Sequence, residues 1–474
     1  MMTRAVALLL AVTFPAAAME HEQRLSSADL RAHWAARSTL AHAVMFSGLG
    51  EPLAPSMGEM DAILQAAGYV MRPRMPEMAL AGAVFAAADP RPAGRSDYAD
   101  PATLRWEPSG FDRNLEVEAQ AWTLAKIASP GFHLTFHAEK AERRAALLMV
   151  PQAEALAAVL EERLLDRDGL FRARGVHGSV SPATPRAQIT VLWGASTALL
   201  ALTSDRDDYW HAGWRQLTRP DRFATLAAKA LRAVEALPPT TPVDRALAIE
   251  ALARHALARA AEGDELARLR AAIVAHAGAL AGAAPQNSLD LSLTIYGLVE
   301  AAAFLRAPEY RKAAWTLYER DLDPLWDDSL PGYRDLERLD PFVAAGWLLG
   351  LQSVRLFASR PLAAEAAARH ARLVTFITGA EGLMLASPLP VVAEPYLQQR
   401  PAADFADPEL PMPEAAGLAP VLAGVLERRG EGWRRSTTRF ATASSMWLAN
   451  VLTVPFEGGA DAFLPRHRLR STSE

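Results

Sequence analysis

Apolar positions recur with the period of an α-helix from about residue 118 onward, and the helices that they predict are of two kinds. One kind is apolar on nearly every face, as in "AQITVLWGASTALLAL" (187–202), and the other is amphipathic, as in "RFATLAAKALRAVEAL" (222–237). Helices that are apolar all round belong inside a helical layer, and amphipathic helices cover them. The pattern therefore predicts an inner and an outer helical layer, and it contains no convincing run of alternating strands.

The two kinds of helix alternate along the chain. Further inner helices are predicted at 288–305, 341–357 and 440–452, and another begins near residue 243. Their starts lie roughly 50 residues apart, except for a last gap of about twice that length, and such a period is typical of helical-hairpin arrays. The loops are too irregular for an open solenoid, whose ends would also need polar caps. We therefore expect an all-α fold in which about five to six hairpins close into an α/α toroid.

Small residues fall on single stripes of two predicted inner helices, which favours close packing of the inner ring. One stripe holds Gly346, Gly350 and Ser353, and the other holds Asp290, Thr294 and Gly297.

The chain opens with the features of a secretory leader. Arg4 precedes the apolar run 5–14, and the small residues 16–18 suit a signal peptidase. The run is too short for a permanent membrane anchor, and no later stretch reaches a spanning length without charge or Pro. We expect a signal peptide at 1–18 and an exported, soluble protein that is periplasmic or secreted, with no membrane anchor.

Two regions interrupt the helical pattern. Residues 19–117 mix short helices with Pro-rich links and are predicted to form an N-terminal extension packed on the toroid domain, 118–474. Residues 387–420 form a long Pro-rich loop, and loops of that length in a compact protein are usually either functional or disordered. The loop is either a strap that fills a groove or a segment that covers a substrate.

Composition excludes several classes of function. The chain has no Cys, which excludes disulfides, thiolate metal sites, Cys nucleophiles and covalently attached haem. The net charge is −5, and no basic patch invites nucleic acid. No Ser-His-Asp signature, phosphate-binding Gly-rich loop or nucleotide fingerprint rises above background, so no cofactor is predicted.

Carboxylates stand at the starts of three predicted inner helices, at Asp244, Asp290 and Asp340. Each has a structural explanation, because side-chain oxygens at a helix N-terminus accept hydrogen bonds from unpaired amides. The functional alternative is that these ends face one opening, where two carboxyl groups could flank a glycosidic bond. Asp290 and Asp340 are the catalytic candidates, since they lie on the most apolar helices.

The stretch "DPLWDDSLPGYRD" (323–335) places aromatic and acidic residues around a Pro-Gly turn. Trp326 and Tyr333 flank three carboxylates, Asp327, Asp328 and Asp335. Aromatic rings stack on the C–H faces of sugars while carboxylates accept their hydroxyl groups. The stretch is therefore either a sugar-binding rim, with Trp326, Asp327 and Tyr333 as ligand contacts, or a corner between helices.

Large aromatic residues also recur on the predicted inner helices, at Trp193, Tyr296, Trp347 and Trp447. They could line the floor of a binding funnel, with Tyr296 as a ligand contact, or fill the core of the ring.

Two histidines four residues apart, His133 and His137, share a face whether their segment is helical or extended. They could bind a metal ion together with Glu139 or the more distant His177. No further ligand is fixed nearby, so ordinary packing or hydrogen bonding is the alternative.

Alternating helices, a hairpin period near 50 residues and turns such as "DRDGLF" (166–171) and "PGY" (331–333) together resemble the six-hairpin glycosidase-like superfamily. The resemblance covers residues 118–455 and rests on architecture, without a motif that carries catalytic residues over. It implies a funnel at one end of the ring, where such proteins bind sugars. The sequence therefore leaves two hypotheses: an exported carbohydrate-binding or carbohydrate-active protein with an oligosaccharide ligand, or a non-catalytic periplasmic factor that binds or assembles an exported partner protein.

Overall fold

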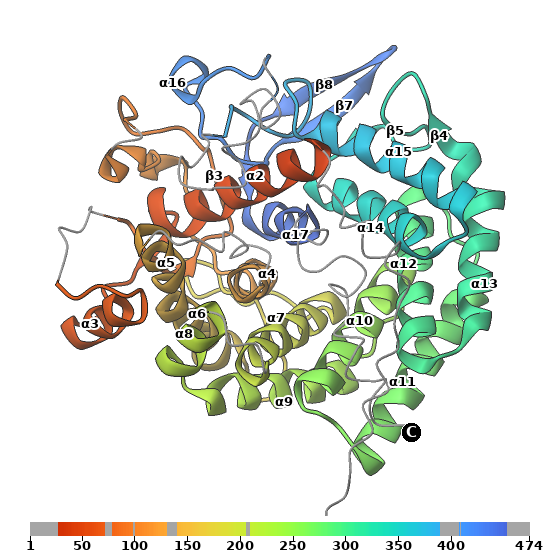
Figure 1. The fold of residues 1–474 in the computed structure, drawn as a ribbon, viewed down its shortest axis with the longest axis horizontal. Helices are drawn as coiled ribbons and strands as arrows, with labels where there is room; N and C mark the ends of the chain where they lie inside the picture. Colours follow the sequence, from red (N-terminus) through yellow and green to blue (C-terminus); the bar gives the residue numbers. More distant parts are fainter. Residues whose placement is uncertain are drawn as a thin grey trace, which may run out of the picture.

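The computed structural model describes residues 27–71, 78–97, 100–129, 140–204, 209–388, 407 and 409–452. Six helices of this part form a closed inner ring in which each packs against the next and the last packs against the first (Figure 1). In order around the ring they are α4 (Val117–Ala128), α7 (Pro185–Thr203), α10 (Pro242–Ala258), α12 (Ser288–Leu305), α14 (Pro341–Phe357) and α17 (Thr442–Leu452).

A second layer of helices surrounds the ring (Figure 1). It consists of α2 (Ser27–Ala41), α6 (Met149–Val159), α9 (Pro220–Ala236), α11 (Gly263–Ala281), α13 (Pro308–Leu317) and α15 (Arg360–Ile377). The arrangement confirms the predicted all-α toroid and the six-hairpin architecture. The region predicted as an N-terminal extension supplies α2, which packs on α17 and α15 and completes the outer layer.

The inner helices begin at one end of the ring, which we call the mouth. Arg186 near the start of α7 contacts Asp244 at the start of α10 and Phe342 at the start of α14. The segments that lead into α4 and α17 also meet there, because Ala87 of β3 (Ala87–Ala88) pairs with both Asp112 and Ala441. Side chains at these helix starts therefore lie together at one end of the ring.

Glycines let the inner helices approach one another closely. A Cβ atom at Gly350 would lie 2.8 Å from the Cα of Ser292 on α12, and one at Gly297 would lie 2.8 Å from the Cα of Ala246 on α10. Both distances are shorter than a carbon–carbon contact permits. The expected role of the small-residue stripes is therefore confirmed at these two positions.

Short strands occur where the sequence pattern predicts none. The largest sheet joins β6 (Arg338–Leu339), β7 (Val425–Arg429) and β8 (Gly432–Thr437), and the remaining strands are β1 (Gly50–Pro52), β2 (Ala81–Val84), β4 (Trp326–Asp327), β5 (Gly332–Tyr333) and β9 (Phe440–Ala441). The β7–β8 hairpin turns at Gly430, whose φ of +60° favours glycine. Together with α15 it occupies part of the long interval between α14 and α17, so the doubled spacing does not hide a further hairpin of long helices in the described residues.

The remaining helices lie outside this two-layer arrangement. They are α3 (Met57–Ala66), α5 (Lys140–Leu147), α8 (Tyr209–Leu217) and α16 (Pro413–Ala416), and the first three pack on one another. Within the described residues, α12 alone is long and apolar enough to cross a bilayer. Most of it is buried in the ring, as expected of an inner helix.

Candidate functional site

The mouth is crossed by Arg186. Its Nε donates a hydrogen bond to Asp244 Oδ1 at 2.8 Å, and its guanidinium carbon lies 4.7 Å from the centre of the Phe342 ring. In the order of the ring, α7 and α14 stand opposite one another, so this contact spans the mouth end of the ring. The N-cap Thr184 fixes the start of α7 by accepting a hydrogen bond from the amide of Ala187.

Glu118, the second residue of α4, lies beside this pair. Burial of its carboxyl group raises its pKa to about 7; the charge of Arg186 opposes the shift, and those of Glu116 and Asp244 add to it. The side chain keeps part of its surface accessible. At neutral pH this group can therefore both donate and accept a proton.

Glu116 strengthens the acidic character of this corner. Its pKa is also raised, first by burial and then by the charge of Asp112. The sequence analysis did not single out either glutamate. The available signal was "LEVEAQ" (115–120), in which two acids begin the first helix of the ring.

The two predicted catalytic residues both lie at the mouth end and both have structural partners. Asp340 caps α14 by accepting hydrogen bonds from the amides of Phe342 at 2.9 Å and Val343 at 3.1 Å. Asp290 stands in the first turn of α12, whose N-cap is Asn287. Burial raises the pKa of Asp290, and a hydrogen bond with the backbone of Gln286 opposes the shift.

The predicted sugar-binding aromatics are buried. Trp326 is 4% exposed, and Tyr333 and Tyr296 are fully buried. β4 pairs with β5, and this hairpin turns Trp326 and Tyr333 inward, so that the Tyr333 ring lies edge-on to Trp326 at 5.4 Å and to Trp347 at 5.2 Å. This burial favours the corner interpretation of 323–335 for Trp326 and Tyr333, and a ligand contact by any of the three rings stays a prediction.

The carboxylates of the same corner are engaged in structural contacts. Asp327 accepts hydrogen bonds from Ser329 and from Arg428, the latter at 2.6 Å, and these contacts hold its pKa well below the usual range. Asp328 pairs with Arg372 at 2.9 Å, and Asp335 accepts a hydrogen bond from the amide of Ser288 at 2.6 Å. Asp327 is therefore a structural ion-pair partner in this conformation.

The inner-ring tryptophans pack together below the mouth. Trp122 lies 4.3 Å from Trp447 and 5.2 Å from Trp193, centre to centre. Trp347 is buried against Tyr333 and donates a hydrogen bond to Ser288. These contacts favour the core interpretation of the inner-ring aromatics.

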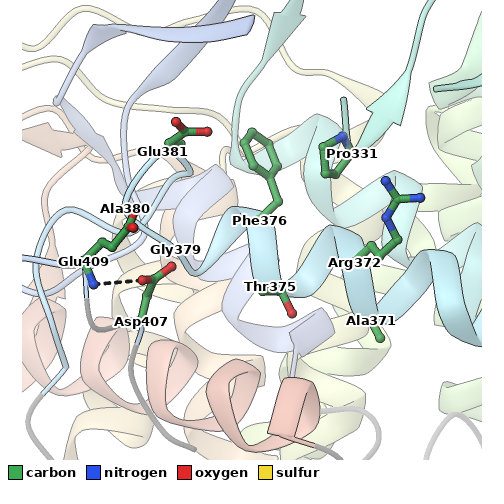
Figure 2. Close-up of a pocket in the computed structure, with 10 residues that line it drawn as sticks. All are labelled: Pro331, Ala371, Arg372, Thr375, Phe376, Gly379, Ala380, Glu381, Asp407 and Glu409. Atoms are coloured by element: carbon green, nitrogen blue, oxygen red, sulfur yellow. Dashed lines mark hydrogen bonds between the residues drawn. The ribbon is translucent and has the colours of Figure 1, made fainter. Parts of the chain in front are cut away.

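A cavity of about 450 Å³ lies on the outer layer, along the C-terminal half of α15 (Figure 2). Its lining includes Pro331, Arg372, Phe376, Glu381, Asp407 and Glu409. Corner 323–335 thus borders a cavity, but it contributes Pro331 and not its aromatic side chains. The described mouth residues do not line this cavity.

Most of the proposed metal ligands lie outside the residues that the structure describes. His133, His137 and Glu139 lie outside the described residues, as does most of loop 387–420. His177 stands in an exposed turn. Within the described residues, no group of three or more His, Asp or Glu side chains could hold a metal ion.

Solved structures similar to this chain include the following two. One is described as "Crystal structure of D-mannose isomerase", with 11% sequence identity, coverage of 85% of this chain and 99% of that chain, and a TM-score of 0.46. The other is "Bacteroides ovatus GH9", with 13% identity, coverage of 90% and 83%, and a TM-score of 0.43. No protein-family model and no curated protein sequence matches the chain.

Proposed function

We propose that this chain is a carbohydrate-active protein that binds a saccharide at the mouth of the ring and uses Glu118 as a general acid or base. The observation that supports this most is the Glu118 side chain, which is partly accessible and whose carboxyl group has its pKa raised by burial to about 7 beside the Arg186–Asp244 ion pair. A group that transfers protons in a reaction works best when its pKa lies near the operating pH.

The neighbours of Glu118 fit the same role. The carboxylate of Asp244 is paired with Arg186, whereas burial raises the pKa of the Glu118 carboxyl group. The two nearby carboxyl groups therefore have different environments. Such a difference lets one group act as an acid and the other as a base or a charge stabiliser. Asp290 and Asp340, at the same end, can accept hydrogen bonds from sugar hydroxyl groups.

We also propose that the protein acts after export, in the periplasm or outside the cell. The basic and apolar leader at 1–18 supports this, because it has the length and the small-residue end of a cleavable signal.

The test compares purified mature protein with two variants. Wild type, Glu118→Gln and Glu309→Gln are incubated with a panel of oligosaccharides; binding is measured by calorimetry and turnover by NMR of the products. Glu309 is the matched control, because it stands in the first turn of an outer helix and is exposed. We expect turnover by wild type and by Glu309→Gln, and a loss of roughly 10²-fold or more in Glu118→Gln. Undiminished turnover in Glu118→Gln, or no saccharide binding by wild type, would overturn the proposal.

The second candidate is a non-catalytic factor that binds or assembles an exported partner protein. The burial of Trp326, Tyr333 and Tyr296 favours it, because a sugar site normally offers an aromatic face and these three do not. In the same assay this function predicts no turnover of any saccharide, and capture of a defined exported protein by the mature chain.

A further inference from the structure

We infer that the saccharide bound at the mouth carries an oxyanion, such as the carboxylate of a uronate or a sulfate ester, and that Arg186 binds it. This inference rests on the proposed function, since it names the class of saccharide for the same site. The observation behind it is the way in which Arg186 is held.

Arg186 is fixed on one edge and open on the other. Nε donates to Asp244, and the plane of the guanidinium is supported by the Phe342 ring 4.7 Å away. Among the described residues, the terminal nitrogens Nη1 and Nη2 make no hydrogen bond, and 31% of the side chain is exposed. Four N–H groups therefore point to no protein acceptor in the described structure. Two of them form the fork that binds a carboxylate or sulfate in a bidentate manner.

The backbone adds to this preference. The inner helices have their N-termini at the mouth, and each helix N-terminus carries a partial positive charge. The helices α7, α10, α12 and α14, each of 17 residues or more, contribute to this field. An anion held by Arg186 would lie within it.

The acidic groups around the mouth do not exclude an anion. Asp244 is paired with Arg186, and Asp340 lies 3.7 Å from Arg338. Burial raises the pKa of Glu118 to about 7, so this carboxyl group can take up a proton near neutral pH when a negative charge approaches. Binding of an acidic saccharide should therefore be accompanied by proton uptake. Its affinity should rise as pH falls from 8 to 6, through the pKa of Glu118 and in the field of Arg186, Glu116 and Asp244.

The test compares acidic saccharides with uncharged ones. Calorimetry at pH 6 and pH 8 measures the binding of three series. They are uronate oligomers, the same oligomers with methyl-esterified carboxyl groups, and oligomers of neutral sugars that carry sulfate esters. The proteins are wild type, Arg186→Met, Arg186→Lys and the control Arg320→Met, whose side chain is 67% exposed on the outer layer. Because Arg186→Met leaves the Asp244 carboxylate without its partner, the double variant Arg186→Met/Asp244→Asn is included.

We expect wild type and Arg320→Met to bind one acidic series at least tenfold more tightly than the neutral ester, and more tightly at pH 6. Arg186→Met and the double variant should lose this preference, and Arg186→Lys should restore part of it. Preference for either the uronate or the sulfated series supports the inference and identifies the oxyanion. Equal binding of charged and neutral oligomers, or an acidic preference that survives in both Arg186→Met proteins, overturns the inference and leaves the proposed function intact. No binding of any saccharide overturns both.

Discussion

Arg355 on α14 and Asp29 on α2 form a two-point ion pair although 326 residues separate them in the sequence. The two bonds measure 3.2 and 3.3 Å, and the side chains are 16% and 5% exposed. The Nδ1 of His370 on α15 lies 3.2 Å from the same arginine. This contact joins α2 to both α14 and α15, so α2 is an integral part of the closed outer layer.

Removing one partner of this pair should destabilise the fold. Arg355→Met leaves the buried carboxylate of Asp29 without its guanidinium, which we expect to lower the free energy of unfolding by about 3–5 kcal/mol in urea titrations. The matched control is Arg320→Met, which breaks an exposed pair with Asp321 and should leave stability nearly unchanged. A loss in Arg355→Met no larger than in the control would show that α2 is held by apolar packing alone.

The close packing of the inner ring predicts that a larger residue at Gly350 destabilises the fold. Gly350→Ala places a methyl group against the backbone of Ser292, and we expect a destabilisation of about 1–3 kcal/mol because the two helices must move apart. Gly278→Ala on the outer helix α11 meets nothing within 4 Å and is exposed. It should stabilise the protein slightly, since alanine favours the helix over glycine. Thermal unfolding of the two variants in parallel measures both effects, and equal shifts would contradict the argument.

Most of the inner ring can be predicted from the sequence, but little of the candidate site can, and the difference has a physical reason. Helices that bury all faces keep an apolar period that can be read directly, and α7, α12 and α14 begin within a few residues of the positions predicted from it. The site depends on which helix starts become neighbours across the ring. Arg186 and Phe342 are 156 residues apart, and no local pattern says that one will lie over the other.

The same dependence on contacts between distant segments explains why the orientation of the aromatic side chains cannot be predicted from the sequence. Trp326 beside two aspartates has the composition of a sugar-binding rim, but its orientation is set by the two-residue pairing of β4 with β5 and by Trp347 on another helix. Glu118 was overlooked because a glutamate in a first helical turn is common. What distinguishes it is the burial and charge supplied by α7 and α10.

Trp326 therefore serves stability, and its substitution separates the two interpretations. Trp326→Ala removes a buried ring that packs on Tyr333 and lies under the guanidinium of Arg369, and we expect a loss of about 3–5 kcal/mol in unfolding free energy. Trp326→Phe keeps most of the packing, so it should fold and bind saccharide with unchanged affinity. A tenfold loss of affinity in a well-folded Trp326→Phe would restore the rim interpretation.

The raised pKa of Glu118 makes stability depend on pH in a defined direction. In the unfolded chain a glutamate titrates near its usual value of 4.5, whereas the folded protein holds this proton until a pH of about 7. Below 4.5 the residue is protonated in both states and costs no stability. As pH rises from 4.5 through 7 the unfolded state ionises first, so the free energy of unfolding falls by about 3 kcal/mol, and the loss remains above pH 7. Glu118→Gln should therefore match the stability of wild type in urea titrations at pH 4 and exceed it by this amount at pH 8.

The control Glu309→Gln should follow the wild-type curve at both pH values. If Glu118→Gln is no more stable than wild type at pH 8, the pKa of this carboxyl group is not raised at the mouth, and its proposed part in proton transfer fails with it.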